Sequence, residues 1–234
     1  MINEESLIQN DKVKVKEVFA SIQGEGPIIG AKQLFIRFCD CNLRCHYCDT
    51  DFEHDYVEYS PQELLEVVNQ FDLNTIDSIS LTGGEPLLSV DFLEKFLPLL
   101  KEKGLKIYLE TNATLPDELK RILPYIDVIA ADIKLESATG MVNSFEFHKN
   151  FFEISRGCTC FAKIVFDDNI TDEEIDKCVA LAQEYGILLI LQPKMIGDVM
   201  SVNSIYAVQI HDKFLKKYKK VRLIPQVHKF LSVR

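Results

Sequence analysis

One segment, Cys39-Asp40-Cys41-Asn42-Leu43-Arg44-Cys45-His46-Tyr47-Cys48-Asp49-Thr50, is the strongest indication of how this chain is organised. Within it Cys41, Cys45 and Cys48 follow a C-x3-C-x2-C spacing, which lets one short loop surround a metal centre with three thiolates. Iron–sulfur clusters normally take four Cys thiolates, and a structural zinc ion also takes four ligands. The loop therefore favours a [4Fe–4S] cluster in which one iron is left for another ligand.

Two other interpretations of these cysteines stay open. A structural zinc ion could use Cys39 together with Cys41, Cys45 and Cys48, although a single residue between two ligands is a shorter gap than zinc sites usually have. A disulfide framework fits less well, because the chain has seven Cys and residues 1–16 contain no apolar signal segment.

The cysteine loop resembles that of the radical S-adenosylmethionine (SAM) enzymes, in which the amino and carboxylate groups of SAM occupy the fourth iron. Its flanks, Gln23-Gly24-Glu25-Gly26, Phe35-Ile36-Arg37 and Cys48-Asp49-Thr50, are similar to those of the 7-carboxy-7-deazaguanine synthase family. The resemblance is strong over residues 17–50, rests on single motifs to about residue 134 and is thinner beyond. It implies three cofactors: a [4Fe–4S] cluster on Cys41, Cys45 and Cys48, SAM, and Mg2+.

Composition limits the other possibilities. A chain of 234 residues that is 47% hydrophobic can bury one core, so we expect a single domain over residues 1–234, with a core at about 13–225 and a C-terminal segment closing over the site. The net charge of −10 argues against nucleic acid as a partner. No stretch approaches the roughly 18 apolar residues of a membrane span. Unpaired cysteines and a cluster need a reducing interior, which predicts a cytoplasmic protein.

Apolar or β-branched runs alternate with helical patterns. This alternation predicts an α/β fold with a largely parallel sheet, which could close partway or lie open. The resemblance implies a partial (βα)6-type radical SAM barrel, with the cysteine loop after its first barrel strand. The predicted strands are Val13–Phe19, Leu34–Phe38, Ser78–Thr82, Lys106–Glu110, Val128–Ile133, Ala162–Phe166, Ile187–Gln192 and Arg222–Ile224.

Two helices carry clear start signals. Ser60 with Glu63, and Thr171 with Glu174, form capping boxes that predict helices to about residues 71 and 185. Helices are also expected to end at Gly104 and Gly186.

In such sheets functional residues gather at the carboxyl ends of the strands. Thr82-Gly83-Gly84-Glu85-Pro86 follows a predicted strand, and its two glycines let the backbone approach a ligand closely. Without further context, this segment could equally be an ordinary glycine turn with an exposed Glu. The resemblance implies a GGEP motif that holds the SAM amino group, and it implies further SAM contacts from Glu110, Thr111, Asn112 and Lys134.

The substrate implied by the resemblance is a pterin that carries a carboxylate. Arg37 offers a planar fork suited to that carboxylate. Thr50 is implied as a Mg2+ ligand beside it, although a Thr in this place is more often a capping residue. The other substrate residues that we predict are Gln23, Gly24, Glu25, Gly26, Thr82, Lys163, Gln192 and His228. Read without the resemblance, these are a glycine-rich turn, structural polar groups and a surface histidine.

Some residues depart from the family pattern. Asp40 stands directly before the first cluster cysteine, where a small residue such as Gly is expected. Cys158, Cys160 and Cys178 are interpreted as packing thiols. An auxiliary metal site would become possible if Cys158 and Cys160 met Cys39 in space.

The resemblance implies a radical SAM lyase that converts 6-carboxy-5,6,7,8-tetrahydropterin to 7-carboxy-7-deazaguanine with release of ammonia, on the route to queuosine-type deazapurines. The radical comes from SAM, so no protein side chain is expected to be catalytic. An external low-potential donor such as flavodoxin or ferredoxin would reduce the cluster, and we expect a homodimer. The alternatives are a glycyl-radical-enzyme activating enzyme and, in another class, an iron–sulfur electron carrier or a zinc-bound interaction module, which would leave Gly83-Gly84-Glu85-Pro86 unexplained.

Overall fold

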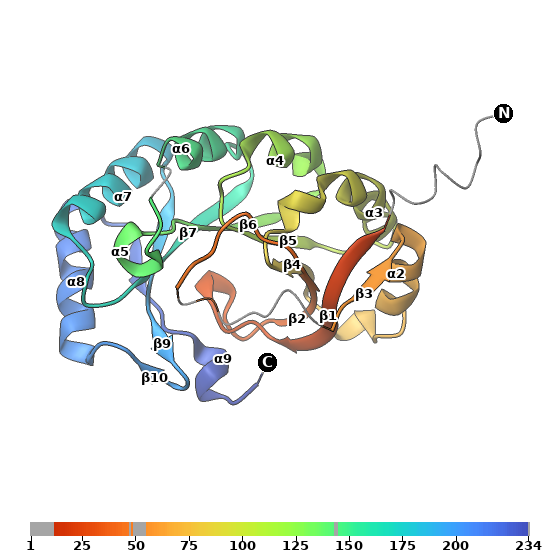
Figure 1. Ribbon diagram of the computed structural model, residues 1–234, viewed down its shortest axis with the longest axis horizontal. Helices are drawn as coiled ribbons and strands as arrows, with labels where there is room; N and C mark the ends of the chain where they lie inside the picture. The colour runs from red at the N-terminus through yellow and green to blue at the C-terminus, as the bar shows by residue number, and fades with distance from the viewer. Residues whose placement is uncertain (1–11, 47, 49–54, 143–144, 234) are drawn as a thin grey trace.

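The computed structural model describes residues 12–46, 48, 55–142 and 145–233. Its main element is a sheet of nine strands in the order β11-β8-β7-β6-β5-β4-β2-β1-β3 (Figure 1). The strands are β1 (Val13–Ile22), β2 (Lys32–Phe38), β3 (Val57–Tyr59), β4 (Ser78–Gly83), β5 (Ile107–Thr111), β6 (Val128–Asp132), β7 (Thr159–Phe166), β8 (Leu188–Pro193) and β11 (Val221–Leu223). The short strands β9 (Met195–Ile196) and β10 (Val199–Met200) form a separate hairpin.

The central part of the sheet is parallel. Strands β2, β4, β5, β6, β7, β8 and β11 pair with their neighbours in parallel, whereas β1 pairs antiparallel with β2 and with β3. Within the described residues β11 and β3 do not pair with each other, so the sheet stays open as a partial barrel. The predicted α/β class, the largely parallel sheet and the position of the cysteine loop directly after β2 are confirmed.

The helices form an arc along one side of the sheet, from α2 through α3, α4, α6 and α7 to α8 (Figure 1). The α-helices are α2 (Pro61–Val68), α3 (Val90–Glu102), α4 (Pro116–Ile122), α5 (Glu136–Thr139), α6 (Phe145–Ile154), α7 (Asp172–Tyr185), α8 (Ser204–Lys217) and α9 (Val227–Phe230). Single 3-10 turns are η1 (Gly26–Ile28), η2 (Leu73–Thr75), η3 (Pro86–Ser89) and η4 (Leu123–Tyr125). The helices of this arc all lie on one side of the sheet, which distinguishes this fold from a doubly wound sheet. The single-turn helices α5 and α9 lie inside the arc (Figure 1).

The predicted strands are all present, and both capping boxes are confirmed. Gly186 ends α7 in the left-handed conformation, as predicted. Helix α2 stops at Val68 instead of residue 71, because the chain turns there into η2, whose first turn is capped by Asp72. Three short strands were not predicted: β3, β9 and β10 have two or three residues each, too few for a periodic pattern.

The two faces of the sheet have different roles. On the outer face, fully buried aliphatic residues such as Ile36, Leu81 and Ile164 belong to one core with the apolar sides of the helices. Cys178 of α7 is part of that core, which agrees with its interpretation as a packing thiol. On the inner, concave face a smaller apolar cluster is formed by Tyr108, Ala130, Phe161 and Ile190.

Among the described residues, no helix combines the length and the apolar character needed to cross a membrane.

Candidate active site

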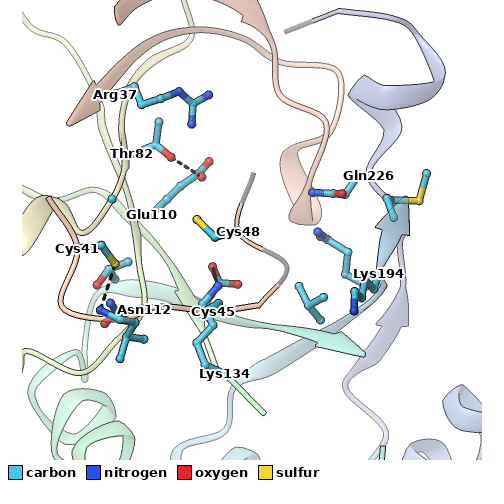
Figure 2. A pocket seen from close by; sticks show the side chains of 18 of the residues that line it. Arg37, Cys41, Cys45, Cys48, Thr82, Glu110, Asn112, Lys134, Lys194 and Gln226 are labelled. Carbon is cyan, nitrogen blue, oxygen red and sulfur yellow. Dashed lines mark hydrogen bonds and ion pairs between the residues drawn. The ribbon is translucent and has the colours of Figure 1, made fainter. Parts of the chain in front are cut away.

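A cavity opens at the carboxyl ends of the parallel strands, and the three cysteines predicted to hold a cluster line it (Figure 2). Its empty space, counted out to the solvent, is about 1000 Å3. The structure brings many of the predicted site residues together in its wall: Arg37, Cys41, Cys45, Cys48, Thr82, Gly83, Gly84, Glu110, Thr111, Asn112, Lys134 and Gln192. They come from the cysteine loop and from successive strand ends, as expected for a site at this edge of a parallel sheet.

The alternation of side chains along the strands explains the polar wall. The inward residues nearest the carboxyl ends form a polar layer: Arg37, Thr82, Glu110, Asp132, Lys163 and Gln192, one from each of β2, β4, β5, β6, β7 and β8. Two positions earlier on the same strands lie Phe35, Ser80, Tyr108, Ala130, Phe161 and Ile190. Because residues i and i+2 of a strand share a face, the concave face has a mainly apolar floor beneath the polar layer.

Backbone contacts hold the cysteine loop in shape. Arg44 donates from Nη1 to the carbonyl oxygens of Cys41 at 2.8 Å and Leu43 at 3.2 Å, and the Cys48 amide donates to the Cys45 carbonyl at 3.1 Å. Burial raises the pKa of the Cys41 and Cys45 thiols, while the nearby Lys134 ammonium group acts in the opposite direction. A cation beside the loop would favour the thiolates that a cluster needs.

The cysteines suit a cluster better than a single ion. All seven cysteines are described and unpaired, and no three His, Cys, Asp or Glu side chains in the described part of the chain are arranged around one metal ion. A cubane cluster does not require such an arrangement, since each thiolate binds a different iron. Cys39, the fourth ligand of the zinc alternative, is buried behind the loop and does not line the cavity.

The remaining cysteines lie away from the cavity. Cys158 and Cys160 are at the amino end of β7, whereas Cys39 follows the carboxyl end of β2. Because the strands are parallel, these two positions lie at opposite ends of the sheet's strands. Cys158 and Cys160 therefore do not meet Cys39, which an auxiliary metal site would require.

The two glycines of the GGEP motif make room for the cysteine loop itself. A Cβ atom on Gly84 would lie 1.9 Å from the carbonyl oxygen of Asp40, and one on Gly83 would lie 2.2 Å from that of Phe38. The backbone amides of Gly84 and Glu85 donate to these same oxygens, of Phe38 at 3.0 Å and Asp40 at 2.9 Å. Asp40 has φ of 48°, in the left-handed region that Gly adopts most easily and Asp tolerates. This explains why a glycine was expected there.

The Glu85 carboxylate bonds within the protein. It accepts hydrogen bonds from the Leu87 amide at 3.0 Å, the Thr111 hydroxyl at 2.8 Å and the Asn112 amide at 2.7 Å. Burial raises its pKa to about 7, although these three hydrogen bonds act to lower it. Glu85 therefore fixes the end of β5 against the turn after β4, and its contact with the SAM amino group stays a prediction.

The side chains of the other predicted SAM residues point in different directions, some into the cavity and one toward the cysteine loop. Glu110 faces the cavity, where its carboxylate accepts from Thr82 at 2.9 Å and from Gln23 at 3.0 Å. Asn112 donates to the Asn42 side chain at 2.8 Å and so ties the end of β5 to the cysteine loop. Lys134 lines the cavity with its ammonium group 3.1 Å from the Asp132 carboxylate.

The loop after β1 supplies the buried carboxylate of Glu25. It accepts from Lys163 at 2.6 Å, Gln226 at 2.6 Å and Gln192 at 3.2 Å. Burial acts to raise the pKa of Glu25, but the ion pair with Lys163 outweighs it and lowers the pKa to about 2. Glu25 is therefore ionised. The side-chain oxygen of Gln192, Oε1, is buried and has no hydrogen-bond partner, which leaves an acceptor for a ligand.

A second cavity, of about 560 Å3 counted out to the solvent, adjoins the first. It is lined by Gln23, Gly24, Glu25 and His228, and it shares Arg37, Thr82 and Glu110 with the first cavity. Gly24 and Gly26 are needed for protein packing: an added Cβ would lie 2.4 Å from the His228 ring and 2.6 Å from the Phe161 ring, respectively.

Thr50 lies outside the described residues, so its predicted role stays a prediction.

Three polar residues of the site were not predicted from the sequence. Glu17 accepts from Arg37 Nε at 2.9 Å, Asp132 contacts two lysines, and Lys194 lines the cavity. Asp132 had a sequence signal, since it is a polar residue close to the carboxyl end of the predicted strand Val128–Ile133.

Comparisons with known proteins agree with this geometry. The Radical SAM superfamily model matches residues 35–188. The chain is 36% identical to the 7-carboxy-7-deazaguanine synthase of Geobacter sulfurreducens over 94% of this chain and 97% of that protein. It is 35% identical to that of Archaeoglobus fulgidus over 93% and 97%, respectively. The crystal structure of QueE from Escherichia coli has a similar fold, with a TM-score of 0.66 at 18% identity, covering 97% of this chain and 100% of that chain.

Gly84→Ala is expected to prevent stable cluster binding, because its Cβ would meet the backbone of the cysteine loop at 1.9 Å. Iron and sulfide content after anaerobic reconstitution is the measurement, with circular dichroism to verify folding. Gly104→Ala controls for a destabilising glycine substitution away from the loop, since its φ of 72° strains an alanine but no atom lies within 4 Å of the added Cβ. A Gly84→Ala protein with full iron content would contradict this.

The apoprotein should lose stability in mild acid through His148. Its Nδ1 lies 3.1 Å from the Ala113 carbonyl oxygen, and burial lowers its pKa to about 4. A depressed histidine pKa stabilises the fold above the unfolded value of about 6.5, and this contribution is lost as the pH falls toward 4. Between pH 7 and pH 5 the loss from this residue is about 2 kcal/mol.

His148→Asn keeps a donor for Ala113 but does not titrate, so its free energy of unfolding should change less over this range. Urea denaturation of both apoproteins at several pH values measures the difference. Parallel pH dependences would show that His148 is not responsible.

Proposed function

The chain belongs to the radical SAM superfamily and, within it, to the 7-carboxy-7-deazaguanine synthases, and we propose that it is a carbon–nitrogen lyase of 7-deazapurine biosynthesis. It converts 6-carboxy-5,6,7,8-tetrahydropterin to 7-carboxy-7-deazaguanine with release of ammonia. The observation that carries the proposal is that one cavity combines Cys41, Cys45 and Cys48 with the strand-end polar layer and the Arg37 guanidinium.

The cluster and SAM, when bound, supply a 5′-deoxyadenosyl radical by reductive cleavage of SAM. The protein holds the cluster through the three thiolates and orients SAM with the backbone at Gly83 and Gly84 and with the Lys134 ammonium group. Glu85 keeps this arrangement rigid, because it is bonded to the ends of both neighbouring loops. A fixed geometry of this kind brings the reacting groups together and excludes water.

The opposite wall would bind the pterin. Glu17 accepts from Arg37 Nε, so the two Nη groups of Arg37 are directed to the cavities, where they would bind the substrate carboxylate (Figure 2). The ionised Glu25 carboxylate and the unpartnered Oε1 of Gln192 are acceptors for the N–H groups of the pterin's guanidine edge. The flat ring would lie over the apolar floor that includes Phe161.

Further components follow from the same proposal. Mg2+ would bind Thr50 and the substrate carboxylate, completing its octahedron with water. The support for this is the Cys48-Asp49-Thr50 sequence, in which Thr50 is two residues from a cysteine that lines the cavity. An external low-potential carrier such as flavodoxin or ferredoxin would donate the electron, and the active protein would be a single-domain, homodimeric enzyme.

The proposed activity is tested with protein reconstituted under anaerobic conditions with iron and sulfide. A low-potential reductant, SAM, Mg2+ and 6-carboxytetrahydropterin are added, and 7-carboxy-7-deazaguanine is sought by mass spectrometry. Product should form with the wild type, be lost with Cys45→Ala, and persist with Cys158→Ala, whose thiol lies at the other edge of the sheet. SAM cleavage without product would favour the activating-enzyme alternative; absence of both a cluster and SAM cleavage would favour the carrier or zinc alternative.

Arg37→Lys tests the carboxylate clamp. Lysine keeps the charge but loses the fork of donors, so KM for the pterin should rise roughly 10- to 100-fold while SAM binding is retained. Steady-state kinetics at saturating SAM measure the effect. Arg121→Lys is a matched control, because Arg121 pairs with Asp91 and Glu94 on the helical surface. An unchanged KM would assign the carboxylate to another group.

A further inference from the structure

A row of alternating charges, buried or partly buried, runs from the loop after β1 to the residues that follow β6. The Glu25 carboxylate is 2.6 Å from Lys163 Nζ, Lys163 Nζ is 3.7 Å from Asp132 Oδ2, and Asp132 Oδ2 is 3.1 Å from Lys134 Nζ. The side chains are 13%, 5%, 17% and 19% exposed in this order. The row starts in the loop proposed to bind the pterin and ends at the lysine proposed to meet SAM.

Asp132 stands in the middle because of the strand register. It is directly opposite Lys163 in the parallel β6–β7 pair, and Lys134 is two residues further along its own chain. A single oxygen, Oδ2, contacts both ammonium groups. The side chain that orients one lysine therefore also orients the other.

We propose that Asp132 is a positioning residue for both substrates: through Lys163 it fixes the Glu25 carboxylate that receives the pterin, and through Lys134 it fixes the cation that receives the SAM carboxylate. This rests on the proposed function. Asp132 itself need not touch either ligand, since it acts through the two lysines.

The charges on Lys163 support this assignment. Burial opposes its ionisation, and the carboxylates around it hold its pKa well above the ordinary value, with Asp132 the largest contributor, followed by Glu25. From β5, Glu110 and the Tyr108 hydroxyl also face it. Without Asp132, Glu25 alone is in direct ion-pair contact with Lys163, so the lysine should lose its proton at a lower pH.

The chain offers a matched structural control on the same strand segment. Asp127, just before β6, is 2.7 Å from Lys101 Nζ and accepts from the Ile107 amide at 2.7 Å. It lies at the amino end of the strand, away from the cavity. Asp127→Asn removes the same charge from a stabilising interaction with no ligand nearby.

The test compares reconstituted wild type, Asp132→Asn, Asp132→Glu and Asp127→Asn. SAM binding is read from the change that SAM causes in the electron paramagnetic resonance spectrum of the reduced cluster, and KM is measured separately for SAM and for 6-carboxytetrahydropterin. With Asp132→Asn, the SAM dissociation constant and both KM values should rise roughly tenfold or more. Asp132→Glu should recover part of the loss, and Asp127→Asn should lower the unfolding temperature only.

The pH profile separates positioning from simple destabilisation. For Asp132→Asn the KM for the pterin should begin to rise at a lower pH than in the wild type, because Lys163 has lost the carboxylate that contributes most to holding its pKa above the ordinary value. Wild-type constants in Asp132→Asn, a rise in only one of the two KM values, or a profile like that of Asp127→Asn would overturn the proposal.

A failure of the proposed function can be distinguished from a failure of the role proposed for Asp132. If the wild type forms no 7-carboxy-7-deazaguanine, the proposed function is wrong. In that case the SAM titration still tests the role of Asp132. A tenfold loss of SAM affinity in Asp132→Asn supports its action through Lys134, and unchanged SAM affinity overturns it.

Discussion

The buried ion pair between Glu25 and Lys163 joins the parts of the chain that enclose the site. Glu25 lies in the loop after β1, Lys163 is on β7, and Gln226 donates to the same carboxylate from the segment after β11. A buried charge without its partner costs several kcal/mol. The positions of loop, strand and C-terminal segment are therefore interdependent, and the shape of both cavities follows from this one contact.

The same strands provide stability and chemistry on opposite faces. On β7, Ala162 and Ile164 are fully buried against the helical layer, while Phe161 and Lys163 face the concave side. Because the arc of helices from α2 to α8 covers the outer face (Figure 1), the inner face is free to carry polar groups where the strands end. The free-energy cost of burying charges there is offset because each charge has a partner. Glu110 accepts hydrogen bonds from Thr82 and Gln23, and Asp132 contacts two lysines.

Local patterns were enough to predict the strands, the capped helices and the cysteine loop. Apolar runs identify strands, and the spacing of Cys41, Cys45 and Cys48 predicts a shared metal centre. Partners distant in sequence could not be predicted: Lys163 and Gln226 are 138 and 201 residues from Glu25. A sequence motif also does not show which protein groups its side chains contact. The GGEP motif does not show that the Glu85 carboxylate also bonds to Thr111 and Asn112, or that the cysteine loop packs tightly over Gly83 and Gly84.

The C-terminal segment also bears on the size of the substrate. The Val227 amide donates to the Gly24 carbonyl at 2.9 Å, and the His228 ring fills the space where Gly24 would carry a side chain. Together with the Gln226–Glu25 bond, these contacts close the pterin side of the site with the protein's own chain. An activating enzyme must admit a loop of another protein, which would have to displace this segment, whereas a small planar molecule needs only the space beside Glu25 and Gln192. An electron carrier would need neither the buried charges nor the acceptor left open on Gln192. Since buried charges are costly to maintain, their alignment toward one cavity is better explained by recognition of a small polar substrate.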